Sequence, residues 1–208
     1  MKKCLIVFFL AVIAFSVTAQ INFGVRAGMN INNFNIKSEY YRAQELGLGF
    51  TGGLFLRLTA GDYFLEPDLM YSRRNSSFTY SPQQNIDTVF NTNRSYLDLP
   101  IHFGKEFFNV ISISTGPVFS LKLSEVAEYY TTNQNQKTKI INEVFQKRNL
   151  GWQIGAGINS GLFMIDFRYE WGFGVFQSFN LPGLISDFNP DGNSHSLQVI
   201  LAMKFISD

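Results

Sequence analysis

The sequence predicts an all-β fold: a closed, eight-stranded, antiparallel up-and-down transmembrane β-barrel with a polar interior. Three observations predict it. Eight segments alternate apolar and polar side chains, the connections between them are alternately long and short, and only 16% of the 208 residues are charged. Ordinary soluble domains carry roughly a quarter charged residues. Tilted strands of about ten residues, like these segments, are long enough to cross a bilayer.

The segment 165–173 shows the alternation most clearly. Its odd positions are all apolar or aromatic, while its even positions are Asp166, Arg168, Glu170 and a glycine. Successive side chains of a strand point to opposite faces. One face of this strand is therefore apolar, and the other carries three formal charges. A helix would scatter the same residues around its axis, so the pattern favours a strand.

The first nineteen residues have the pattern of a secretory signal peptide. Two lysines precede the apolar run 5–17, and a small-residue triplet ends at Ala19. We expect cleavage after Ala19, which leaves 20–208 as one barrel domain. Cys4 is the only cysteine, so the mature chain would have no thiol for a disulfide or a metal. Fifteen basic residues would remain against 16 acidic ones, which gives no basic footprint for nucleic acid.

The first four segments alternate in the same way. Leucine, isoleucine, methionine and aromatic residues occupy one face, and glycine, asparagine and charged residues occupy the other. No Asp, Glu, Lys or Arg falls on an apolar face in any of the eight segments. The first four segments are 21–30, about 46–58, 63–72 and 97–104, with Arg26, Arg57, Glu66, Asp68, Asp98 and His102 on their polar faces.

The last four segments follow the same rule with more glycine and serine. Their polar faces carry residues such as Gly116, Gln153 and Gly155, and their apolar faces carry branched and aromatic residues such as Trp152 and Phe167. Glycine weakens a strand, so its repeated use marks places where a bulky group approaches closely. These four segments are 111–121, 150–159, 165–173 and about 195–205.

The connections give an independent signal. Short links at 59–62, 105–109 and 159–161 alternate with longer ones, of which 74–93, 122–149 and 175–194 are predicted as loops. Barrels of the outer membrane have short periplasmic turns and long extracellular loops, whereas a soluble meander has no reason to sort its loops by end. An even number of strands then places both termini on the periplasmic side.

Alternation alone does not say which face is inside. Apolar faces could pack a soluble core, or they could meet lipid while the polar faces fill the barrel. Glycines on the polar face, ionic residues of both signs and aromatic residues near segment ends favour lipid outside. A soluble ligand-binding barrel is the alternative.

The polar faces predict an ionic network inside the barrel. Buried charges persist only when they are paired and hydrogen-bonded. We expect Arg26 and Arg168 to be held by the carboxylates of this set, and we expect the filled barrel not to conduct. The predicted network comprises Arg26, Glu66, Asp68, Asp98, His102, Asp166, Arg168 and Glu170.

Little in the sequence points to catalysis. His102 faces the interior by parity, which suits a hydrogen-bonding role, and His195-Ser196 lies near the outer end of the last segment without a third partner. Glu66 and Asp68 could exchange protons, but nearby arginines favour ion pairs. Two histidines and no mature cysteine make a metal site improbable. We therefore expect no enzyme activity, cofactor or metal.

One stretch, 124–147, could carry function. It places Tyr129, Tyr130, Ile140, Ile141 and Phe145 among polar residues. Loops on rigid scaffolds often bind partners, so these side chains could form an extracellular surface for a protein or ligand. The same stretch could equally be a strand extension that stands above the membrane.

With the strands placed, five stretches together form a pattern: 23–30, 65–72, 96–100, Gly116-Pro117 and Arg168-Tyr169. On these stretches the chain resembles the PorT-like outer-membrane β-barrel family of Bacteroidetes-type bacteria. The resemblance implies the barrel fold and the outer-membrane location, and one branch of that family takes part in protein secretion across the envelope. The chain departs from the family's pattern at Asn75 and at the three residues after Phe205.

The sequence thus predicts a monomeric, non-conducting barrel of the outer membrane, in the size class of OmpX-like proteins. Its expected partners are outer-membrane lipid and a protein or ligand at the extracellular loops, and it would act as a structural or interaction protein. An accessory of envelope assembly or protein secretion and a lipid-modifying enzyme are the alternatives within the membrane.

Overall fold

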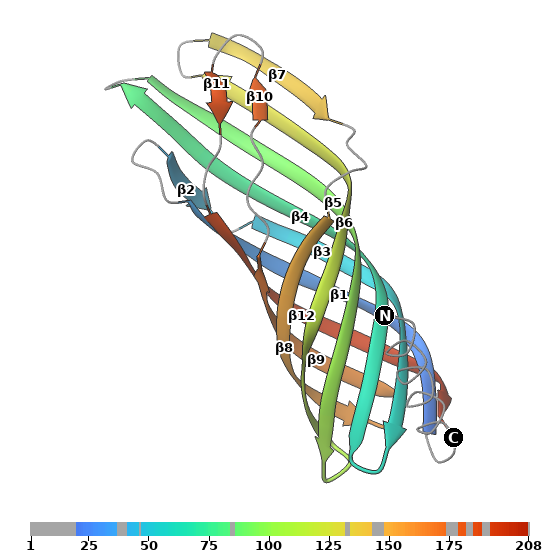
Figure 1. Ribbon diagram of the computed structural model, residues 1–208. Coiled ribbons are helices and arrows are strands. Elements are labelled where there is room, and N and C mark those ends of the chain that lie inside the picture. Colours follow the sequence, from blue (N-terminus) through green and yellow to red (C-terminus); the bar gives the residue numbers. More distant parts are fainter. Residues whose placement is uncertain are drawn as a thin grey trace, which may run out of the picture.

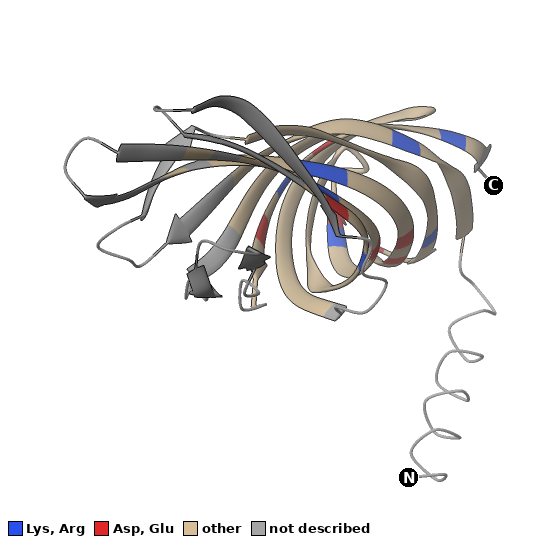
Figure 2. Cartoon of the chain, turned by 90° about the horizontal axis from the view of Figure 1, so that it is seen from above, with Lys and Arg blue, Asp and Glu red and all other residues tan. Residues whose placement is uncertain are grey.

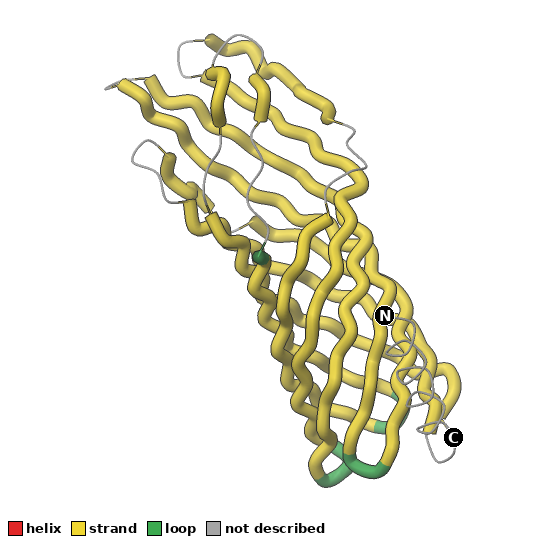
Figure 3. Tube along the Cα trace, in the orientation of Figure 1, coloured by secondary structure: helices red, strands yellow, loops and turns green. Residues whose placement is uncertain are grey.

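The computed structural model describes residues 20–36, 41–45, 47–83, 86–131, 134–142, 148–173, 179–181, 185–188 and 192–207. In these ranges nearly every residue lies in a strand (Figure 3), and they contain no helix long and apolar enough to span a membrane. The strands are β1 (Gln20–Ile36), β2 (Tyr41–Glu45), β3 (Gly47–Ala60), β4 (Tyr63–Gln83), β5 (Ile86–Phe107), β6 (Ile111–Thr131), β7 (Gln134–Asn142), β8 (Arg148–Ser160), β9 (Phe163–Gly172), β10 (Phe179–Leu181), β11 (Ile185–Phe188) and β12 (Gly192–Ser207).

Eight of these strands form a closed antiparallel barrel in the order β1-β3-β4-β5-β6-β8-β9-β12 (Figure 1). Closure runs from β12 back to β1, with Ser207 opposite Asn22 and Gly192 opposite Ile36. Closing the sheet pairs the edges that an open sheet would expose. The predicted fold class is confirmed.

Short turns connect the strands at the end of the barrel where β1 begins and β12 ends. Gly61 and Gly161 take φ of 58° and 59°, and Phe108 and Asn109 take 55° and 56°. Positive φ is natural for glycine and asparagine but costly for phenylalanine. Backbone hydrogen bonds join the turns laterally; one runs from the Glu106 N–H to the Asp62 carbonyl at 2.7 Å.

At the other end, strands replace much of the loop structure expected from the sequence. The expected loop 74–93 is instead a hairpin of β4 and β5, paired from Arg74↔Arg94 to Gln83↔Ile86. Polar residues occupy both faces of this hairpin, and the barrel below already fixes its pairing. The absence of an apolar face therefore misled the sequence interpretation.

The β4–β5 hairpin belongs to a larger sheet beyond the barrel. β6 continues to Thr131 and pairs with β7, while β2 pairs with β4 on the opposite edge. Figure 1 shows this sheet, β2-β4-β5-β6-β7, rising to one side of the barrel mouth. β10 and β11 pair only with each other among the described strands.

The orientation of the two faces follows from exposure. Phe167 and Leu99 are 50% and 41% exposed, whereas Arg168 and Glu66 are 3% and 1% exposed. Apolar side chains therefore form the outer surface, and charged side chains lie inside the cylinder. Figure 2 marks the positions along the strands that carry Lys, Arg, Asp and Glu. Such an outer surface requires hydrocarbon as its solvent, which excludes the soluble-barrel alternative.

Outward-facing side chains form an apolar belt around the barrel. On β4 the belt runs from Tyr63 to Tyr71, and on each other strand it comprises the outward-facing residues at the same height along the barrel axis. Aromatic pairs mark both rims of this belt. Near the turns, the Tyr63 and Phe103 rings stack with their centroids 5.9 Å apart. Near the mouth, the Tyr169 and Trp171 rings meet edge to face with their centroids 4.6 Å apart.

Candidate functional site

The lower half of the barrel interior holds a layer of three arginines and three carboxylates, which we call the lower layer. It is formally neutral, and it draws its members from β1, β3, β4 and β9. Each member is nearly inaccessible to water. The lower layer consists of Arg26, Arg57, Glu66, Asp68, Asp166 and Arg168.

Two arginines, from the strands on either side of β12, share the same acceptors in the lower layer. Arg26 Nη1 lies 2.8 Å from Glu66 Oε1 and 2.7 Å from Asp68 Oδ2. Arg168 Nη1 lies 2.7 Å from Asp68 Oδ2, and its Nη2 lies 3.0 Å from Glu66 Oε1. Asp166 is within 3.4 Å of Arg26 and 3.2 Å of Arg168. The arrangement thus ties β1, β4 and β9 together across the barrel.

Glycines on the polar faces make room for these side chains. A Cβ at Gly157 would lie 2.2 Å from Asp166 Oδ1, and a Cβ at Gly155 would lie 3.2 Å from Arg168 Cγ. Likewise, a Cβ at Gly104 would lie 2.2 Å from the Phe64 ring. An eight-stranded barrel is only just wide enough for its side chains, so large and minimal residues must alternate inside.

A second layer lies nearer the mouth, and we call it the upper layer. Arg74 donates to Asp98 Oδ2 at 2.7 Å and to Glu170 Oε1 at 2.9 Å. Gln153 and Gln198 donate to Glu170 Oε2 at 2.8 and 3.2 Å. One guanidinium and two amides therefore satisfy the Glu170 carboxylate without a second cation.

His102 lies between the two layers. Its Nε2 lies 2.8 Å from Gln153 Oε1, and its Nδ1 lies 4.0 Å from Asp68 Oδ2. The ring is 0% exposed. His102 thus lies deep in the barrel, hydrogen-bonded to the Gln153 amide of the upper layer, with its Nδ1 turned toward the Asp68 carboxylate of the lower layer without a hydrogen bond to it.

A third cluster lies above the belt, where β5 and β6 leave the membrane. Arg94 Nε donates to Glu125 Oε1 at 2.7 Å, and Lys122 contributes a second cation to the same carboxylate. Burial raises the pKa of the Glu125 carboxyl, but Arg94 and Lys122 lower it by more, so the pKa lies below its usual 4.5. The carboxylate is therefore charged throughout the neutral range.

The structure brings all eight residues of the predicted network into the interior. Arg57 and Arg74 belong there too, but the sequence prediction did not include them. The sequence pattern puts Arg57 on a polar face without a partner and predicts a loop at Arg74. Arg74 has the same even-numbered position on β4 as Glu66 and Asp68. Extending that strand to residue 74 would therefore have predicted Arg74 on the interior face.

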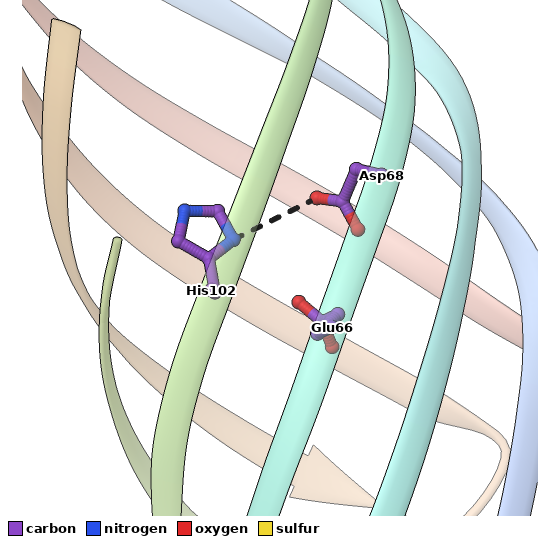
Figure 4. A group of neighbouring side chains, drawn as sticks. All are labelled: Glu66, Asp68 and His102. Carbon is purple, nitrogen blue, oxygen red and sulfur yellow. Dashed lines mark ion pairs between the residues drawn. The ribbon is translucent and has the colours of Figure 1, made fainter. Parts of the chain in front are cut away.

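One trio has donor atoms close enough to suggest a metal centre. Ligand atoms of Glu66, Asp68 and His102 lie within 4.8 Å of one another (Figure 4). However, Arg26 and Arg168 already donate to both carboxylates. Two guanidinium groups at this position repel a further cation, so the trio does not fit a divalent metal and works as part of an ion-pair network.

The histidine–serine sequence near the mouth does not form a catalytic pair. His195 is on the outer face, where its Nδ1 lies 3.0 Å from the Tyr169 hydroxyl. Ser196 is on the opposite face and is 3% exposed. Adjacent residues of a strand point apart, so the two side chains cannot act together.

The residues predicted as a loop surface are divided among two strands and an undescribed stretch. Tyr129 and Tyr130 belong to β6, and Ile140 and Ile141 belong to β7. Phe145 lies outside the described residues. The backbone around the first four is thus part of the sheet above the mouth, as the strand-extension interpretation expected.

A sequence model described as "Outer membrane protein beta-barrel domain" matches residues 16–177. The chain belongs to this family. Its apolar belt and its family membership place this outer-membrane barrel in the bacterial outer membrane. No curated protein matches the chain.

Solved structures of similar shape include small outer-membrane proteins. Ail, the attachment invasion locus protein of Yersinia pestis, crystallised with the heparin analogue sucrose octasulfate, has a TM-score of 0.51 at 14% identity, covering 91% of this chain and 100% of Ail. Neisserial surface protein A has a TM-score of 0.46 at 12% identity, covering 88% and 97%. At these identities the likeness concerns the fold alone.

Proposed function

We propose that this outer-membrane barrel is a non-conducting interaction protein that presents a rigid sheet to molecules outside the cell. The observation that carries the proposal is the continuation of β4, β5 and β6 above the belt as paired strands, widened by β2 and β7. A hydrogen-bonded sheet fixed to a barrel is pre-organised for binding, because less order must be imposed when a partner docks.

The non-conducting part of the proposal is supported by the filled interior. Arg26, Glu66, Asp68 and Arg168 are each at most 3% exposed, and their pairs cross the lumen. A path for ions would have to break several buried ion pairs. Planar-bilayer recording of the purified barrel tests this proposal: we expect no channel current, and steady single-channel steps would contradict it.

Absence of catalysis is also part of the proposal. His102 is buried within the network, and His195 is separated from Ser196 by the sheet. Unchanged lipid A in a deletion strain is the expected result, and a missing lipid A modification would reinstate the lipid-modifying enzyme.

Photo-crosslinking on intact cells tests the interaction role. A photoreactive amino acid replaces Ser77, which faces outward on β4 above the belt, and a matched variant carries it at Phe167 within the belt. We expect protein or glycan adducts from position 77 and lipid adducts alone from position 167. Lipid adducts alone at both positions would remove the proposal.

A narrower candidate rests on the PorT-like stretches, such as 65–72 and 96–100. It makes the barrel an accessory of envelope assembly or protein secretion. Co-purification with components of a secretion machine, and a secretion defect on deletion, would favour it. The signal peptide with cleavage after Ala19 and the monomeric state belong to the same proposal; amino-terminal sequencing and light scattering of the purified barrel test them.

A further inference from the structure

Very few charged side chains face away from the barrel axis. Among residues whose side chains the structure describes, three charges face outward: Asp62 and Lys105 at the turn end and Arg73 at the mouth end. The Lys105 ammonium already has partners: its Nζ lies 3.7 Å from Asp62 Oδ2 and 5.2 Å from the centroid of the Tyr63 ring. Arg73 has no carboxylate partner among the described side chains.

Arg73 lies at the upper boundary of the apolar belt. It is the cross-strand partner of Phe50, which is 48% exposed and meets the Tyr71 ring at 5.9 Å. Leu48, one level higher on β3, is also exposed at 57%. An arginine flanked by lipid-facing side chains sits at the depth of lipid headgroups, above the acyl chains.

The guanidinium is held by its neighbour in a defined orientation. Arg73 Nε donates to Asn93 Oδ1 at 2.7 Å, and Asn93 is on the adjacent strand β5. This leaves the two terminal nitrogens without an acceptor in the described part of the chain. Paired N–H groups of this kind match two oxygens of a phosphate.

Polar pairs surround Arg73 on the outward face. The Tyr71 hydroxyl donates to Ser95 Oγ at 2.9 Å just below it, and Ser77 Oγ donates to Asn91 Oδ1 at 2.8 Å above it. The surface thus changes within two rungs of the β4–β5 ladder from aromatic side chains to hydroxyls and amides. A glycolipid makes the same change, from acyl chains to phosphate and sugar hydroxyls.

We propose that the outward face of β4 and β5 around Arg73 is a docking site for a phosphorylated glycolipid of the outer leaflet. The guanidinium binds its phosphate, Phe50 and Tyr71 cover its proximal acyl carbons, and the Ser95 and Asn93 level meets its sugar. Continuity with the apolar belt and the unpaired positive charge commit the site to this occupant. The inference does not depend on the proposed extracellular partner.

Native mass spectrometry of the purified full chain tests the site. The probes are diphosphorylated lipid A and the same acylated disaccharide without phosphates. We expect Arg73→Gln to retain the phosphorylated lipid about tenfold less well, the equivalent of one hydrogen bond to a charged group. Lys105→Gln removes the same charge at the opposite rim and should leave retention unchanged.

Two further variants separate orientation from charge. Arg73→Lys keeps the positive charge but removes the paired N–H donors. Asn93→Ala keeps the guanidinium but removes the hydrogen bond that orients it. Each variant should retain the phosphorylated lipid less well than wild type and better than Arg73→Gln. A heat-shift gel verifies that every variant is folded. Equal losses from Arg73→Gln and Lys105→Gln, equal retention by Arg73→Gln and wild type, or equal retention of the unphosphorylated glycolipid would each overturn the proposal.

Discussion

Arg168 on β9 donates to Asp68 on β4 at 2.7 Å, although the two residues are 100 positions apart and their strands are not hydrogen-bond neighbours. The contact therefore crosses the lumen instead of following the sheet. Asp68 Oδ2 also lies 2.7 Å from Arg26 Nη1, so one carboxylate oxygen connects three strands. Internal charge thus cross-braces a cylinder whose wall is held by backbone hydrogen bonds.

Removing Arg168 should leave buried carboxylates without a partner. We expect Arg168→Ala to lower the free energy of unfolding by about 3–5 kcal/mol, because the desolvation cost of Glu66 and Asp68 is no longer offset. Urea unfolding of the barrel in vesicles measures this. Arg168→Met combined with Asp68→Asn keeps the layer neutral and should cost less than Arg168→Ala alone; an equal or larger cost would contradict the network's role.

Charge on the outer face should depend on depth. Leu99, 41% exposed within the belt, lies in hydrocarbon, and Leu99→Arg should cost roughly 2–4 kcal/mol of unfolding free energy. The matched variant Ser95→Arg, on the same strand near the upper rim, should cost about 0–1 kcal/mol. Equal costs for the two variants would argue against a belt with its upper edge at that level.

The interior glycines should be intolerant of a methyl group where a ring fills the space. A Cβ at Gly104 would meet Phe64 Cζ at 2.2 Å, and the Phe64 ring itself packs under Arg57 at 4.1 Å. We expect Gly104→Ala to destabilise by about 1–3 kcal/mol through overpacking. Gly52→Ala is the control, since its nearest neighbour would be at 3.5 Å and unfolding should change little. Heat-shift midpoints compare the two.

Acid should weaken the cluster above the belt. The folded-state pKa of Glu125 lies below 4.5 because Arg94 and Lys122 outweigh its burial. A lowered pKa contributes stability above the unfolded-state value, and that stability is lost as the pH falls through the folded-state pKa. The stability difference between wild type and Glu125→Gln should therefore be full at pH 7 and disappear well below pH 4.5. A difference independent of pH would mean that the carboxylate is not the stabilising form.

Much of the fold could be predicted because a barrel in lipid obeys a strict period. Residues such as Leu99 and Phe167 must face hydrocarbon, so every second position is restricted, and the restriction is visible in one sequence. The same period places Arg26 and Arg168 on the interior face of the barrel in the sequence prediction. It failed above the apolar belt, where polar residues occupy both faces and the pattern of residues 74–93 no longer distinguishes a strand from a loop.

The sequence by itself determined which side of each strand meets lipid, how many strands cross the membrane and that charges such as Arg26 and Arg168 lie inside, because an ionic side chain is costly in hydrocarbon. Only the tertiary structure decided which charges meet. Pairing across the lumen depends on strand register and tilt, which no local pattern encodes, and this is why Arg74 joins Asp98 and Glu170. The same register sets Asn93 beside Arg73 and leaves that guanidinium facing the lipid.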